Sequence, residues 1–207
     1  MPESLRDMRL FVAVYEERSF TAAATREKAT QPGVSQHIRK LDLSGEFDPR
    51  ALRHALGQFA TGVAVITTCT ADDKLEGLTV NSFASVSLDP PLVLWCLQRT
   101  APSFQSFAAA GVFAVSVLGA DQRALSHRFA TAAVHKFSSV PHVPGYGGAP
   151  RLADALAWFE CRTERTVDGG DHVIFIGRVM RAGYRDGEPL VFSAGRYCLP
   201  ARLADAA

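Results

Sequence analysis

Several features of membrane and secreted proteins are missing from this sequence of 207 residues. No apolar run reaches the length of about 20 residues that a membrane-spanning helix needs. The first residues mix charged side chains, such as Glu3 and Arg6, with apolar ones, which is not the pattern of a secretory signal peptide. We therefore expect a cytoplasmic protein that does not bind membranes.

Cysteine is scarce, and the spacing of the four cysteines fits neither a metal site nor a redox pair: Cys69, Cys96, Cys161 and Cys198. We predict reduced thiols, mostly buried on strands, and no bound metal. The formal net charge is only +1, so the chain as a whole has no pull toward nucleic acid or an anionic surface. A glycine-rich dinucleotide fingerprint, a phosphate-loop lysine and paired carboxylates at catalytic spacing are also absent.

The composition that remains favours a folded, mainly β protein. Hydrophobic residues make up 47% of the chain and charged residues 21%, which allows a sizeable core. A β-branched run at 62–70, a fully apolar run at 92–97 and a further predicted strand at 112–118 are separated by turn residues. The Asp-Gly-Gly-Asp segment at 168–171 is a strong hairpin signal. Because only short helical segments lie between these runs, we predict a barrel rather than a βαβ sheet.

The stretch 77–91 shows the strictest alternation in the chain. One parity is predicted to face the core, and it holds Leu78, Val80, Ser82, Ala84, Val86 and Leu88. The other parity holds Thr79, Asn81, Phe83, Ser85 and Ser87, which offer donors and acceptors without charge. Such a face suits a flat ring with a polar rim, such as a nucleobase or a flavin. A half-exposed strand that is merely rich in hydroxyls would show the same pattern.

The N-terminal residues form a separate helical segment by pattern. An apolar stripe runs through 5–17, an Ala-rich helix is expected at 22–28, and Thr30 can cap a third helix with polar side chains outward. Three short helices with an amide-bearing third helix are what a helix-turn-helix requires. The motifs at 11–14, 19–24 and 30–42 resemble the DNA-binding head of LysR-type transcriptional regulators.

This segment departs from the LysR pattern in two ways. Glu27 occupies a position where that pattern has a core leucine, and the wing that follows the third helix is absent. Its basic and acidic side chains nearly balance, so it starts with little attraction for phosphates. We therefore expect residues 1–43 to pack or dimerise rather than bind DNA. The turn-rich residues 44–49 mark a boundary before a second domain at 47–198.

The order of motifs in this second domain identifies a further resemblance. Phe-Ala-Thr-Gly-Val at 59–63, the segments 77–83 and 85–93, Gly-Asp-His at 170–172 and Gly-Arg-Tyr at 195–197 resemble the flavin reductase family of two-component monooxygenases. The resemblance implies an FMN-binding split β-barrel with short flanking helices and a homodimer. It also implies reduction of FMN or FAD by NADH or NADPH, with the reduced flavin passing to a separate oxygenase.

The same resemblance implies a set of site residues. The isoalloxazine rim would be held by Thr79, Asn81, Ser82, Phe83, Ser85 and Val86, with Cys96 and Leu97 beside it. Arg99, Thr100 and Ser103 match the phosphate loop of the family, and Lys136 with Phe137 match its basic-aromatic pair. His172 would position the nicotinamide, and Tyr197 would close the pocket.

Two other functions remain open on the sequence. One is a DNA-binding regulator that uses a flavin-binding barrel as its sensor. The other is a flavin-binding barrel with little turnover, or one that reduces another acceptor such as a corrinoid. Neither FMN over FAD nor NADH over NADPH follows from the residues.

Overall fold

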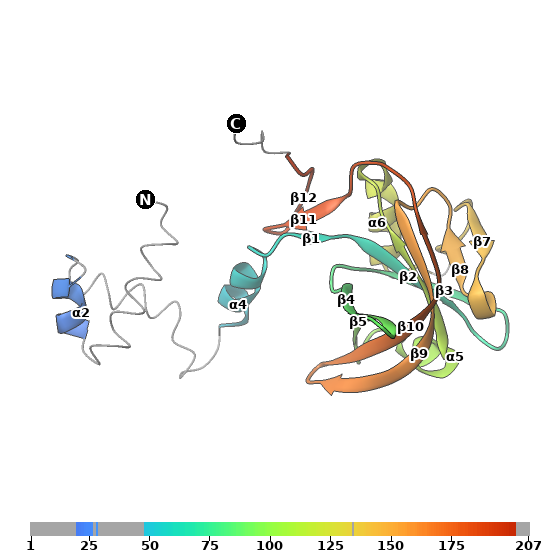
Figure 1. Ribbon diagram of the computed structural model, residues 1–207, viewed down its shortest axis with the longest axis horizontal. Helices are drawn as coiled ribbons and strands as arrows, with labels where there is room; N and C mark the ends of the chain where they lie inside the picture. The colour runs from blue at the N-terminus through green and yellow to red at the C-terminus, as the bar shows by residue number, and fades with distance from the viewer. Residues whose placement is uncertain (1–19, 27, 29–47, 134, 202–207) are drawn as a thin grey trace. The chain divides into compact units, whose positions relative to one another are not determined.

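The computed structural model describes residues 20–26, 28, 48–133 and 135–201 (Figure 1). The chain forms two compact units, residues 1–56 and 57–207. The first unit contains the helices α2 (Phe20–Arg26) and α4 (Pro49–Leu56). The Ala-rich helix predicted at 22–28 is thus present with shifted bounds, and the predicted helices on either side of it lie outside the described residues. Asp48 caps α4, because its Oδ1 accepts from the Arg50 backbone N–H at 2.9 Å.

The second unit is built on a seven-stranded antiparallel sheet. In spatial order its strands are β3 (Leu75–Val80), β2 (Ala64–Cys69), β6 (Val112–Val117), β9 (Ala157–Gly169), β10 (His172–Tyr184), β5 (Pro91–Gln98) and β4 (Ala84–Leu88). A small sheet joins β1 (Thr61–Gly62), β11 (Val191–Ser193) and β12 (Arg196–Cys198), and a hairpin pairs β7 (His142–Pro144) with β8 (Pro150–Leu152). The predicted mainly β architecture is confirmed.

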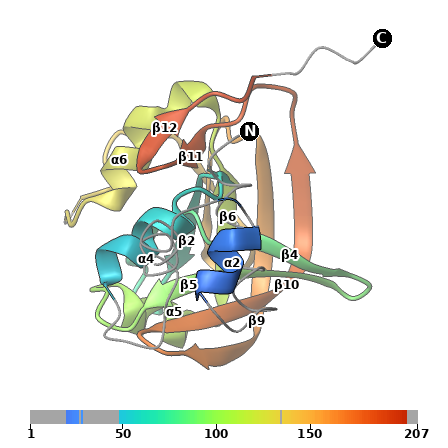
Figure 2. The same ribbon diagram turned by 90° about the vertical axis from the view of Figure 1, so that its left-hand side faces the viewer.

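Short helices flank the sheet, as predicted. They are α5 (Phe104–Ala110), α6 (Arg123–Ala130) and the 3-10 turns η1 (Ala120–Gln122) and η2 (Tyr146–Gly148). Figures 1 and 2 place α5 and α6 at opposite ends of the curved sheet. Asp121 lies inside η1, and the residue before α6 is Gln122. The segment 140–150 contains β7 and η2.

The sheet curves but stays open between β3 and β4, although these two edge strands follow one another in the chain. The expected single long strand at 77–88 is therefore wrong. Residues 81–83 cross from one edge of the sheet to the other, and the alternation does not survive the crossing. Val80 is buried, but Val86 is 46% and Leu88 92% exposed, whereas Phe83 packs against the core.

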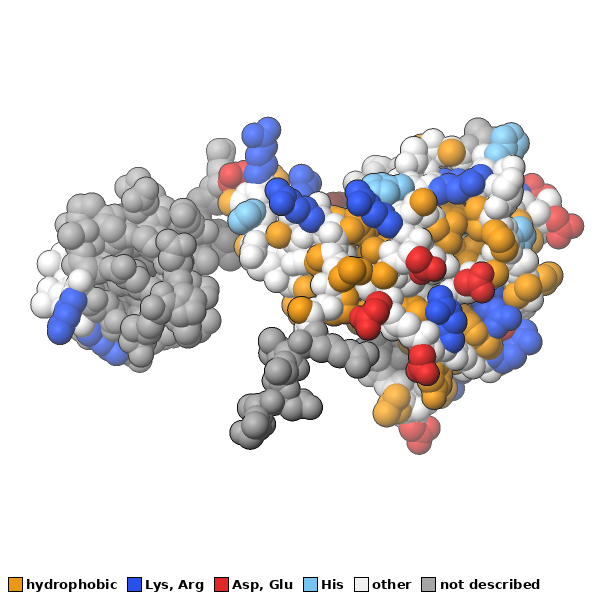
Figure 3. Space-filling model, turned by 90° about the horizontal axis from the view of Figure 1, so that it is seen from above, with side chains coloured by type: hydrophobic (Ala, Val, Ile, Leu, Met, Phe, Trp, Pro, Cys, Tyr) orange, Lys and Arg blue, Asp and Glu red, His pale blue; other side chains and the backbone are white. Residues whose placement is uncertain are grey.

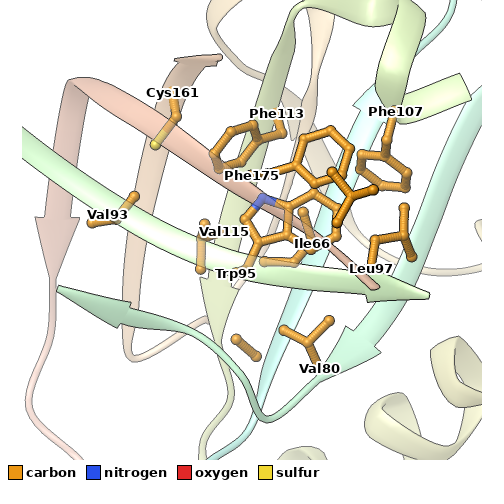
Figure 4. Close-up of a cluster of buried hydrophobic side chains, with 12 residues drawn as sticks. Ile66, Val80, Val93, Trp95, Leu97, Phe107, Phe113, Val115, Cys161 and Phe175 are labelled. Carbon is orange, nitrogen blue, oxygen red and sulfur yellow. The ribbon is translucent and has the colours of Figure 1, made fainter. Parts of the chain in front are cut away.

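The main core lies inside the curved sheet and is centred on Trp95 (Figure 4). The indole stacks on Phe175 at 4.7 Å between ring centroids and meets Phe107 and Phe113 edge-on at 5.1 and 5.7 Å. A second core, which includes Phe129 of α6, uses Val65 from the other side of β2 and Val63 just before this strand. Because β2 is buried on both faces, its sequence is apolar and β-branched without alternation.

All four cysteines are free and lie on strands. The expectation that most are buried was too strong, since Cys161 is buried, two are half-buried and Cys198 is exposed. Within the described residues no helix is long and apolar enough to cross a membrane.

The packing around Phe113 generates a stability prediction. A Cβ on Gly177 would collide with the Phe113 ring and lie 3.1 Å from the Cβ of Cys161. Gly177→Ala should therefore destabilise the fold by about 1–3 kcal/mol, as other overpacked cores do. Gly62→Ala is the matched control, because nothing lies within 4 Å of a Cβ there. Urea unfolding of both variants is the measurement, and equal midpoints would show that the Phe113 contact imposes no constraint.

Candidate functional site

The chain's crossing between β3 and β4 is held by Ser82. Its hydroxyl accepts from the backbone N–H of Cys96 at 3.0 Å and lies 3.4 Å from the Cys96 carbonyl oxygen. On β5, Cys96 lies beyond Leu94, which is the last residue paired with β4. The Ser82 side chain thus takes the place of a strand partner where the backbone has left the sheet. It leaves the exposed side chains of Asn81 and Ser85 at the gap, and among the described residues no hydrogen bond is found for either.

Four of the predicted site residues converge on the helix α6. Thr79 donates from its hydroxyl to the Ser126 carbonyl at 2.7 Å, and the Tyr197 hydroxyl lies 2.8 Å from Ser126 Oγ. Lys136 donates to the Phe129 carbonyl at 3.0 Å, and the Phe137 ring meets the Phe129 ring edge-on at 5.1 Å. The structure therefore brings Thr79, Lys136, Phe137 and Tyr197 together around one helix.

The ammonium group of Lys136 also donates to the Gly77 carbonyl at 3.1 Å, so it ties the end of α6 to β3. Burial lowers the pKa of Lys136, and the nearby charge of Glu76 opposes this shift. A lysine that donates to two carbonyls near a helix C-terminus stabilises the helix end. This geometry gives Lys136 a structural role, whatever else it contacts.

Arg99 and His172 lie together at the other end of the candidate set. The last strand pair joins His172 of β10 to Gln98 of β5. The Arg99 guanidinium pairs with Asp168 and donates to the Gly170 carbonyl at 3.2 Å, while the Arg99 backbone N–H donates to Asp171 at 2.9 Å. Arg99 is thus fastened to the β9–β10 turn that carries His172.

The His172 side chain is 42% exposed, and its Nδ1 lies 2.8 Å from Asp171 Oδ1. This hydrogen bond lowers the pKa of Asp171 below its ordinary value. The imidazole is thereby oriented by its neighbour at the mouth of the turn. The sequence analysis named neither Asp168 nor Asp171 as a site residue, although both lie in the hairpin motif that it identified.

The remaining predicted residues do not share one environment. The side chains of Leu97 and Phe83 belong to the main core, and Phe83 packs 5.4 Å from the Phe159 ring. Thr100 and Val86 are exposed, and Ser103 precedes α5 without a capping hydrogen bond from its side chain. Leu97 can therefore contribute only its backbone to a site, because its side chain is 1% exposed.

The thiols near the sheet are poor nucleophiles. Burial raises the pKa of Cys161 to about 12, and burial also raises that of Cys96, with the Ser82 hydrogen bond opposing it. Both groups are therefore protonated at neutral pH and lack the thiolate that thiol chemistry needs. Among the described residues, no group of three or more His, Cys, Asp or Glu side chains could hold a metal ion.

Ser126 and His127 are two site neighbours that were not among the residues predicted from the sequence. Ser126 is buried in α6, and the His127 ring packs edge-on against Tyr197 at 5.0 Å. A signal for Ser126 was present, because it lies three residues before Phe129 on the apolar side of the helix. A polar residue in such a stripe needs a partner inside the protein.

Comparison with known proteins identifies the family of this chain. The family described as "Flavin reductase like domain" matches residues 56–200. The chain belongs to this family. Residues 5–43 match a second family, described as "Bacterial regulatory helix-turn-helix protein, lysR family", in agreement with the resemblance seen in the sequence.

Named relatives are similar to the flavin reductase-like domain. A "Probable flavin reductase" of Rhizobium meliloti is 46% identical over 158 residues, which cover 76% of this chain and 50% of that protein. "FMN reductase (NADH) SmoA" of Agrobacterium fabrum is also 46% identical, over 74% of this chain and 87% of its own length. The match thus spans only half the length of the first relative. Two other relatives, 39% identical, are named as the reductase component or subunit of flavin-dependent monooxygenases.

A solved structure shows the same fold. The NADH:FAD oxidoreductase SgcE6 of Streptomyces globisporus superimposes with a TM-score of 0.73 at 41% sequence identity. The similarity covers 78% of this chain and 98% of that one. The open seven-stranded sheet described above is therefore the split barrel that the sequence motifs predicted.

The contacts of Arg99 with Asp168 and Gly170 hold its side chain against the β9–β10 turn. Two variants test whether Arg99 also binds a flavin phosphate, as the sequence predicts. If Arg99 binds a phosphate, Arg99→Ala should weaken flavin binding about ten- to a hundredfold, the loss of about 1.5–3 kcal/mol for a charge-assisted hydrogen bond. Asp168→Asn removes only an exposed ion pair and should change affinity by less than about fivefold. Flavin fluorescence titrations measure both. If the two variants bind flavin equally well, Arg99 serves only to hold the β9–β10 turn.

Proposed function

We propose that this protein uses NADH to reduce FMN or FAD and supplies the reduced flavin to a separate oxygenase. The observation that carries the proposal is the match of residues 56–200 to the flavin reductase-like family, together with relatives named for these activities. The match spans only half the length of the Rhizobium meliloti relative, so the proposal covers flavin reduction and no further activity of a longer relative.

The residues at the gap between β3 and β4 fit a flavin. Asn81 and Ser85 offer exposed, uncharged polar groups there, and Thr79 and Ser82 are fixed by bonds within the protein. A ring with a polar rim needs donors and acceptors of this kind at its edge. The bound flavin supplies the hydride-accepting ring, so the protein needs no strong acid or base.

The task of the protein is then to hold two rings at the correct distance. Orientation of reacting groups alone lowers barriers by about 7–11 kcal/mol in well-aligned cases. We propose that His172, oriented by Asp171, positions the nicotinamide, and that Asn81 and Ser85 contact the flavin rim. The position of His172 at the start of β10, next to Gln98 of β5, supports this assignment.

The assay that tests the function follows NADH oxidation with and without added flavin. We expect rapid oxidation only when FMN or FAD is present. His172→Ala should raise the KM for NADH and slow reduction of bound flavin about a hundredfold, because a misplacement of about 1 Å has that effect. Flavin affinity should stay near the wild-type value. A protein that binds flavin but oxidises no NADH would favour the low-turnover barrel, and activity with a corrinoid alone would favour the other acceptor.

We further propose that the protein is a homodimer. Figure 2 shows the β4–β5 hairpin extending from the rest of the sheet, and its residues Val86 and Leu88 are 46% and 92% exposed. On the neighbouring β9–β10 hairpin, Val167 and Met180 are 41% and 42% exposed. Figure 3 shows one face of the unit formed by residues 57–207, on which hydrophobic side chains lie together among charges of both signs. Exposed apolar surface of this kind marks an interaction site.

Light scattering should therefore give a mass of about twice the 22.3 kDa chain at micromolar concentration. Leu88→Lys should shift the protein toward monomer, because it places a charge in the apolar contact. Val143→Lys is the control, since Val143 is 40% exposed on β7, away from this hairpin. A monomeric wild type, or a dimer that Leu88→Lys leaves intact, would contradict the proposed interface.

The match of residues 5–43 to the lysR family favours a DNA-binding regulator as the second candidate. The balanced charge of this segment and its missing wing argue against it. We propose that the segment has no useful DNA specificity and that the protein acts in the cytoplasm, where NADH and free thiols occur together. Specific retention of an operator by the full chain at physiological salt, in the presence of excess bulk DNA, would overturn the DNA part of this proposal.

A further inference from the structure

The residue Ser126 lies between two predicted flavin-site residues that come from different sheets. Ser126 is a polar residue of α6, but its side chain is fully buried beside the apolar Phe129 and Leu125. Its carbonyl accepts from the Thr79 hydroxyl at 2.7 Å, and its Oγ lies 2.8 Å from the hydroxyl oxygen of Tyr197. Ser126 therefore links β3 to β12 through the helix.

Two hydroxyl groups share the bond between Ser126 and Tyr197, but each carries its own proton. If Tyr197 donates, the Ser126 proton is left in a buried site, and the described residues provide it with no other hydrogen bond. If Ser126 donates, the Tyr197 proton is left on a half-exposed side chain that can reach solvent or a ligand. An unpartnered donor is much more costly inside a protein than at its surface. Ser126 is therefore the donor, and Tyr197 keeps its own proton for an outside acceptor.

The ring of Tyr197 is held in place on several sides. His127 and Phe192 meet it edge-on at 5.0 and 5.4 Å between centroids, and the Arg123 guanidinium lies 5.5 Å from its centre. Arg123 and His127 come from the same helix as Ser126. The hydroxyl group thus has a fixed position as well as a fixed direction of donation, and such preorganisation favours binding.

We propose that Ser126 is a positioning residue that makes Tyr197 a hydrogen-bond donor to an acceptor oxygen of the bound flavin nucleotide. The inference rests on the proposed function only in its choice of ligand. The positive charge of Arg123 over the same ring favours an oxygen that carries negative charge. Thr79, anchored on the Ser126 carbonyl, holds the helix and the strand β3 in register with this donor.

A double-mutant cycle on the full-length protein tests the proposal, with flavin fluorescence quenching by FMN and FAD as the readout. Ser126→Ala and Tyr197→Phe should each raise the Kd about three- to tenfold, as expected for the loss of one uncharged hydrogen bond. The double variant should bind no more weakly than Tyr197→Phe, because both changes remove the same donor.

The matched control is Thr131→Ala at the end of the same helix, where the lost hydroxyl donates to the His127 carbonyl at 2.9 Å and has no contact with Tyr197. It should leave the Kd unchanged. Additive losses in the double variant, or a Ser126→Ala variant that binds flavin like wild type, would overturn the proposal. If Ser126→Ala does not fold, Tyr197→Phe decides, and wild-type affinity in that variant would overturn it too. These binding measurements need no turnover, so a protein that binds flavin without oxidising NADH would contradict the proposed function alone.

Discussion

The bond between the Ser82 hydroxyl and the backbone of Cys96 is the constraint on which the site depends. An edge strand normally leaves a row of backbone groups without partners. Here the last pair of β4 and β5 joins Ala84 to Leu94, and the Ser82 side chain satisfies the next backbone N–H on β5. The chain can therefore leave the ladder over residues 81–83 without exposing a buried donor. The Asn81 side chain of that crossing is thereby left exposed.

The helix α6 holds a second group of the candidate residues in place. Thr79 and Lys136 attach it to β3 by hydrogen bonds, and Phe129 presses against the strand. A Cβ on Gly77 would lie 2.7 Å from the Phe129 ring, so only glycine allows the helix to come this close. The burial that lowers the pKa of Lys136 results from the same close packing. Contacts that hold the fold and contacts that orient Thr79 and Tyr197 are thus the same contacts.

Much of this fold follows from local sequence patterns. Short helical segments such as α5 lie between the strands as expected, and the hairpin at 168–171 connects β9 and β10 as its Asp-Gly-Gly-Asp motif indicated. The strand expected to continue through 81–88 is broken for a physical reason. Alternation of apolar and polar residues cannot show that the chain crosses from one sheet edge to the other within three residues. Phe83 and Leu97 were predicted to line the flavin site, but their side chains pack in the core. Their partners, such as Phe159, are distant in the sequence and become visible only in the fold.

The identity of the family could be read from the sequence because the chemistry requires so little of individual residues. A hydride that moves between two bound rings needs neither a thiolate nor a strong base, and the thiols of Cys96 and Cys161 are held protonated by burial. What remains is a set of uncharged groups in a fixed order along β3, β4 and β5. The positions of these groups are encoded locally in the sequence. Ser126 instead contacts Tyr197 across 71 residues of sequence, and Asp168 contacts Arg99 across 69. The residues proposed to bind the ligand are therefore readable from motifs, and those proposed to orient them are readable only from the structure.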